Sequence, residues 1–74
     1  MNRLPKIGDY ILDMTKGKFE GEIGVLIAIR DDKYCIKWIL TNDPDLKNSI
    51  VDHLVSDLEW YKIISKDRAM VELL

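Results

Sequence analysis

The sequence predicts an all-β fold, a single domain of five short strands, and three observations carry this prediction. Segment 34–38 (YCIKW) alternates with a period of two, so that Tyr34, Ile36 and Trp38 share one face, as in a strand with one buried side. Segment 25–29 (VLIAI) is apolar at both parities and rich in β-branched residues, which indicates a strand that buries both faces or coils strongly. Clusters of turn-forming residues separate the apolar segments.

The order of elements follows from the same patterns. Pro5 and the polar start predict a loose lead-in over residues 1–6, and residues 65–74 form a tail that packs back as a short helix or an added strand. Between them, residues 7–64 form the domain. Its strands are expected at residues 10–14, 25–29, 34–40, 50–55 and 60–64.

Several connections between these strands have recognisable chemistry. Gly21 and Gly24 sit where the second strand begins, and glycine permits the sharp or positive-φ backbone that such an entrance needs. Segment 41–49 is rich in turn formers and is the longest loop. Before the last strand we expect a single helical or 3₁₀ turn, with Ser56 as its cap and Leu58 filling the core.

The first strand is expected to present one better apolar face. Tyr10, Leu12 and Met14 alternate there with Asp9, Ile11 and Asp13. On this pattern the side with Asp13 faces away from the core.

Size and composition exclude several classes of protein. A domain of 74 residues buries only about 60% of the surface of its unfolded chain, which leaves little room for an enclosed active site. One cysteine and one histidine provide neither a disulfide nor the four ligands of a structural zinc site. No segment resembles a signal peptide or a membrane span, so we expect a cytoplasmic protein without a membrane partner.

The charge distribution disfavours nucleic acid as a partner. The net charge is −2, and residues 39–74 carry four Lys or Arg against seven Asp or Glu. Binding to a phosphate backbone depends on clustered cations and on release of counterions. Direct RNA or DNA binding is therefore the alternative rather than the first hypothesis.

Three stretches resemble the SH3-like small β-barrels, and most closely their KOW and Tudor-like branch. Segment 8–11 (GDYI) resembles the opening Gly-Asp-x-Val of the family, segment 21–29 (GEIGVLIAI) resembles its Gly-x-x-Gly-x-Val-x-x-Ile, and segment 34–38 resembles its third strand. The resemblance covers about residues 7–64, and Asp13 departs from it because the family usually has an apolar residue there. It implies a five-stranded barrel and a non-catalytic binding module, in the setting of a nucleic-acid-processing assembly.

Residues that suggest catalysis or metal binding have simpler interpretations. Asp52 and His53 are neighbours in a strand and point to opposite faces, and no nucleophile is placed for the histidine to activate. Cys35 is expected on the solvent face of its strand, without the cationic surroundings of a reactive thiol. The acidic loop with Asp43 and Asp45 lacks the glycine hinge and closing glutamate of a calcium site. We predict no enzyme, no cofactor and no metal.

The aromatic residues divide between core and surface. A Tudor-like barrel can form an aromatic cage for methylated Lys or Arg, but Tyr34 and Trp38 share a face with Ile36 and are expected in the core. Phe19 is expected to cap the open end of the barrel, with an exposed position on the loop as the alternative. Trp60 and Tyr61 are adjacent in the last strand, so one of them should be exposed.

The partner is expected to be a protein that binds the loops after the first and third strands. These loops offer charges of both signs, which suits a protein surface better than phosphates. The apolar tail is the next candidate, as a docking or homo-oligomer segment. The predicted partner-binding residues are Lys16, Lys18, Phe19, Asp43, Asp45, Lys47, Trp60 and Tyr61.

Overall fold

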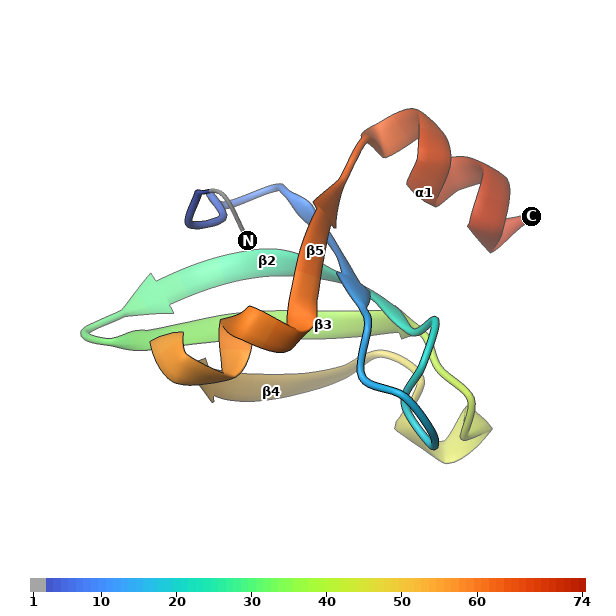
Figure 1. Cartoon of the computed structure of the whole chain (residues 1–74), viewed down its shortest axis with the longest axis horizontal. Coiled ribbons are helices and arrows are strands. Elements are labelled where there is room, and N and C mark those ends of the chain that lie inside the picture. Colours follow the sequence, from blue (N-terminus) through green and yellow to red (C-terminus); the bar gives the residue numbers. More distant parts are fainter. Residues whose placement is uncertain (1–2) are drawn as a thin grey trace.

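The computed structural model describes residues 3–74 and shows five antiparallel strands in one sheet, followed by a helix (Figure 1). The order of strands in the sheet is β4-β3-β2-β1-β5. Part of the predicted lead-in, residues 1–2, lies outside the described residues. The strands are β1 (Tyr10–Asp13), β2 (Ile23–Arg30), β3 (Lys33–Leu40), β4 (Ser49–Leu54) and β5 (Tyr61–Ile64).

The predicted all-β character and the number of strands are confirmed. The strands expected at 25–29, 34–40 and 50–55 are displaced by only a few residues at their ends. A two-residue turn joins β2 to β3, and Asp31 in it takes a positive φ of 53°, which Asp tolerates better than most residues. Gly21 has φ 84°, the left-handed backbone expected at the entrance to β2.

Two short 3₁₀ helices interrupt the strands, η1 (Pro44–Leu46) and η2 (Val55–Trp60). The predicted turn before the last strand is therefore confirmed, and Leu58 is buried in the core as expected. The predicted cap is wrong, because the turn begins at Val55 with Leu54 as its N-cap, which places Ser56 inside it. The carboxylate of Asp57 accepts the backbone N–H of Leu54 at 3.1 Å. The turn also extends to Trp60, so β5 begins one residue later than predicted.

The main core lies between β2–β3 and the segment formed by β1, η2 and β5, which crosses in front of them in Figure 1. Half-buried Tyr61 and Ile63 of β5 pack against its buried members, which come from β1, β2, β3 and η2: Ile11, Leu26, Tyr34, Ile36, Trp38 and Leu58. The prediction that Tyr34 and Trp38 belong to the core is confirmed.

The tail forms α1 (Lys66–Leu73), so of the two predicted alternatives the structure has the helix. Ser65 caps it by accepting the backbone N–H of Arg68 at 3.1 Å. Ala69 anchors it in a second apolar cluster with Leu12, Ile23 and Ile64. Within residues 3–74 no helix has the length and apolar character needed to cross a bilayer.

Two predictions about which side of a strand is buried are wrong. Ile11 and Asp13, assigned to the outer side of β1, are both buried. Ile11 packs in the main core and Leu12, on the opposite face, packs in the second cluster with Ala69, so both faces of β1 are covered. Cys35 is also buried rather than solvent-facing. Its pKa is raised by a hydrogen bond with Asp52 and by burial, which opposes thiolate chemistry.

Candidate functional site

A pocket of about 270 Å³ opens between the loop joining β1 to β2 and the loop joining β3 to β4. Apolar and aromatic side chains make up most of its wall: Phe19, Trp38, Leu46, Val51 and Tyr61. Polar groups enter the wall at a few points: Asp13, Glu22, Thr41, Ser49 and His53. A concave apolar site with a few convergent polar groups is the usual form of a binding site.

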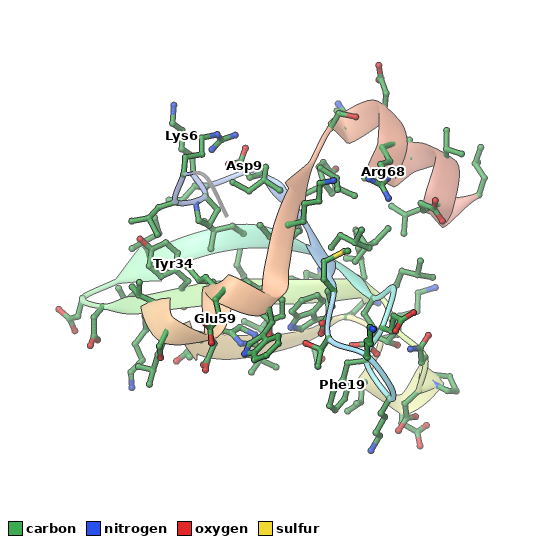
Figure 2. The ribbon with its side chains drawn as sticks, in the orientation of Figure 1. Lys6, Asp9, Phe19, Tyr34, Glu59 and Arg68 are labelled. Atoms are coloured by element: carbon green, nitrogen blue, oxygen red, sulfur yellow. The ribbon has the colours of Figure 1, made fainter. Side chains whose placement is uncertain are left out.

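The two loops are held together by Asn42. Its side-chain amide donates to the backbone carbonyls of Lys18 at 2.8 Å and Glu20 at 3.1 Å. Its backbone N–H donates to Oε2 of Glu22 at 2.9 Å. In Figure 2 the loop carrying Phe19 accordingly runs beside the loop that contains η1. The mouth of the pocket is therefore braced before any ligand arrives.

Three aromatic rings form one wall of the pocket. Trp38 comes from β3, His53 from β4 and Tyr61 from β5, and each pair of rings meets edge to face with centroids 5.4–5.7 Å apart. This arrangement matches the preferred geometry of aromatic pairs. The wall thus consists of side chains fixed by three strands, which resist movement better than a loop does.

Hydrogen bonds within this wall fix the protonation of His53. The indole Nε1–H of Trp38 donates to Nε2 of His53 at 3.2 Å, so Nε2 carries no proton. The proton of the neutral ring is then on Nδ1, which lies 3.3 Å from the Tyr61 hydroxyl and donates to it. A second proton on the ring would break the bond from Trp38.

Burial keeps His53 and Tyr61 uncharged. It lowers the pKa of His53 from the ordinary value of 6.5, against the opposite influence of Asp57, Asp13 and Asp52. Burial, together with the negative charges of Asp13, Asp57 and Glu22, raises the pKa of Tyr61 to about 12. The carboxylates therefore place a negative potential over a pocket whose other polar groups are neutral.

The state of His53 makes stability depend on pH. Because its folded pKa lies below 6.5, the unfolded chain takes up the proton first as the pH falls, and the unfolding free energy decreases below about pH 6.5. We expect the thermal midpoint to drop between pH 7.5 and 5.5 in the wild type, and to stay nearly level in His53→Gln. An NMR titration of this single histidine giving a pKa of 6.5 or more would contradict the assignment.

Two carboxylates occupy the polar side of the pocket. Asp13 ends β1 and is 5% exposed, and Glu22 immediately precedes β2 and is 6% exposed. Backbone bonds from Asp13 N–H to the Glu22 carbonyl and from Gly21 N–H to the Asp13 carbonyl hold the two ends of this loop side by side. Both carboxylates thus depend on the pairing of β1 with β2.

The predicted binding residues are only partly brought to this pocket. Phe19 and Tyr61 line the pocket. Phe19 is 41% exposed, so its ring covers the end of the domain less completely than expected. Asp43 accepts the backbone N–H of Asp45 at the start of η1. The remaining charged candidates are exposed on the two loops outside the pocket wall: Lys16, Lys18, Asp45 and Lys47.

Trp60, not Tyr61, is the exposed member of the adjacent aromatic pair. It is 56% exposed and absent from the pocket wall, whereas Tyr61 is half-buried in it. Trp60 ends η2, so the two residues do not alternate as neighbours in one strand.

Sequence reasoning missed the polar half of the pocket. Asp13 and Glu22, which line the pocket, and Asn42, which joins the loops, received no binding role, and His53 was considered only as a catalytic residue. One signal was available, since Asp13 departs from the apolar residue usual at its position in the resembled family. Within residues 3–74, no cluster of three or more His, Cys, Asp or Glu forms a metal site.

Comparisons with protein families, with curated proteins and with solved structures find no match for this chain.

Proposed function

We propose that this chain is a non-catalytic binding module, built as a small SH3-like barrel, that docks onto a segment of a protein partner. The observation that supports the proposal most is the pocket between the two braced loops, with its apolar wall and its polar side. The five antiparallel strands and the 3₁₀ turn before the last one support the family assignment. Such barrels serve as scaffolds for binding in many settings.

The chemistry of the pocket favours a protein segment over a phosphate backbone. Asp13 and Glu22 would repel phosphates, and a mostly apolar wall offers side chains a place to bury surface. Exposed Phe19 and Leu46 extend the apolar surface to the rim. A side chain of a protein partner can bury apolar surface against the wall, and a cationic one can also complement the two carboxylates.

Direct RNA or DNA binding is the second candidate function. Lys16, Lys18 and Lys47 are exposed on the loops around the pocket, and three lysines near one another can contact phosphates. The acidic groups Asp43 and Asp45 on the same loops weaken this candidate.

The two candidates differ in their response to charge reversal. We expect Lys16→Glu with Lys18→Glu, and separately Asp43→Lys with Asp45→Lys, to weaken capture of the partner by severalfold, because a protein surface complements both signs. The partner is obtained by pull-down from lysate with and without nuclease. Arg30→Glu, in a strand away from the two loops, is the control and should leave capture unchanged.

Other outcomes count against the proposal. Nuclease-sensitive capture that is weakened by the lysine changes and strengthened by the aspartate changes would indicate nucleic acid, as would a steep loss with rising salt. Capture unaffected by either pair but lost on changing Val71 and Leu74, both exposed in the tail, would move the docking or homo-oligomer surface to α1.

A further inference from the structure

We propose that the pocket receives an unmodified arginine side chain of the partner, with its guanidinium held by Asp13 and Glu22. This inference rests on the proposed function, since it requires the pocket to be the docking surface. It is carried by the placement of two nearly buried carboxylates in an otherwise apolar and neutral cavity.

Each carboxylate has one oxygen committed to the protein and one left over. Oδ1 of Asp13 accepts the backbone N–H of Thr15 at 2.8 Å, and Oε2 of Glu22 accepts the backbone N–H of Asn42 at 2.9 Å. Among residues 3–74, no hydrogen bond reaches Oδ2 of Asp13 or Oε1 of Glu22. Yet no fully buried side-chain oxygen within residues 3–74 lacks a partner. Both free oxygens therefore keep some exposed surface, and both residues line the pocket.

Free carboxylate oxygens in an apolar cavity call for a ligand that brings positive charge and N–H donors. A carboxylate with little access to water is costly unless a cation or hydrogen bonds compensate it. The negative charges of Asp13 and Glu22 already raise the pKa of Tyr61, and neutral His53 adds no opposing charge. An anionic ligand is disfavoured at the same place.

Arginine fits this combination better than other cations. Its planar guanidinium presents five donors, binds carboxylates through paired hydrogen bonds and stacks on aromatic rings. The apolar wall with Trp38 and Tyr61 suits its plane and its methylene stem. A trimethylated lysine satisfies the ring attraction but has no N–H for the two free oxygens. The cavity volume of about 270 Å³ accommodates one such side chain.

The ligand class is tested with short peptides on the isotopically labelled chain. The probe is Gly-Ser-Arg-Ser-Gly, and the matched peptides carry citrulline, lysine or trimethyl-lysine in place of arginine. We expect the arginine peptide to shift the indole N–H of Trp38 while that of Trp60 stays in place. Citrulline has nearly the same shape without the charge, and its peptide should bind about tenfold more weakly or worse.

The carboxylates are tested with substitutions that keep their structural bonds. In Asp13→Asn and Glu22→Gln the amide oxygen still accepts from Thr15 or Asn42, but the charge is lost. We expect each to weaken the arginine peptide about tenfold. Asp32→Asn, in the β2–β3 turn, is the matched control and should bind as the wild type does. If a variant fails to fold, comparing the arginine and citrulline peptides on the wild-type chain still tests the proposal.

The failures of the two proposals are distinguishable. Equal binding of arginine and citrulline, tighter binding of trimethyl-lysine, or no shift of the Trp38 indole would overturn the arginine pocket. If partner capture still depends on the two loops in that case, the docking module stands without it. If the arginine peptide binds as expected but the loop variants capture the partner normally, the pocket stands as a cation site and the proposed docking surface falls.

Discussion

Trp38→Ala is expected to lower the unfolding free energy by about 3–5 kcal/mol, the usual range for truncating a buried large aromatic. Trp38 is 5% exposed, packs in the main core and meets the rings of His53 and Tyr61 edge to face. Its loss also leaves Nε2 of His53 without a donor. For a domain of this size, such a change removes much of the total stability. Chemical denaturation followed by circular dichroism measures it.

The second tryptophan gives a matched control. Trp60 is 56% exposed, so Trp60→Ala should change the unfolding free energy by no more than about 0.5 kcal/mol, apart from any effect on η2. A loss below about 1 kcal/mol for Trp38→Ala would place this ring outside the core. The aromatic wall formed by Trp38, His53 and Tyr61 would then not exist as described.

Gly24→Ala is expected to destabilise the protein by about 1–3 kcal/mol through overpacking. A Cβ on Gly24 would lie 2.5 Å from Cγ2 of Ile36 and 2.9 Å from Cε3 of Trp38. Its backbone φ is not positive, so crowding, not backbone strain, is the cause. Elsewhere in a strand the same change would tend to stabilise, since alanine has less freedom in the unfolded chain.

A second substitution isolates this cause. Leucine at position 36 has no Cγ2 branch at Cβ, so Ile36→Leu removes the closest atom. We expect Gly24→Ala to cost less in the Ile36→Leu background than in the wild type, a coupling that a double-mutant cycle measures. A neutral or stabilising effect of Gly24→Ala alone would contradict the close packing of β2 on β3.

The strands could be predicted because their signal is local. Alternation in β3 reflects the burial of Tyr34, Ile36 and Trp38 in the core. The β-branched run also located β2, but only its first half is buried: after the register shift between Leu26 and Ala28, Ile27 and Ile29 are exposed, so the expected burial of both faces is wrong there.

The same reasoning failed at β1. This strand buries Ile11 and Asp13 as well as Leu12, because Ile11 packs in the main core and Leu12 packs in the cluster with Ala69. Alternation therefore does not show which face is buried.

The pocket was only partly predictable because its parts come from distant segments. Asn42 joins two loops that lie more than twenty residues apart in the chain, and no local pattern predicts such a bond. From the sequence alone Asp13 is expected at the surface, and its burial becomes evident only when β1 is paired with β2. The loops after the first and third strands were expected to bind the partner, whereas the carboxylates at their base follow from the register of the sheet.

The claim that the pocket and its two loops form the docking surface is tested most directly by NMR mapping of the captured partner segment on the labelled chain. We expect the largest shifts of backbone amides at Phe19, Glu22 and Asn42 and at the indole of Trp38, with little change at Asp32 in the β2–β3 turn. Shifts confined to α1 or to the β2–β3 turn, with the Trp38 indole unmoved, would contradict the account.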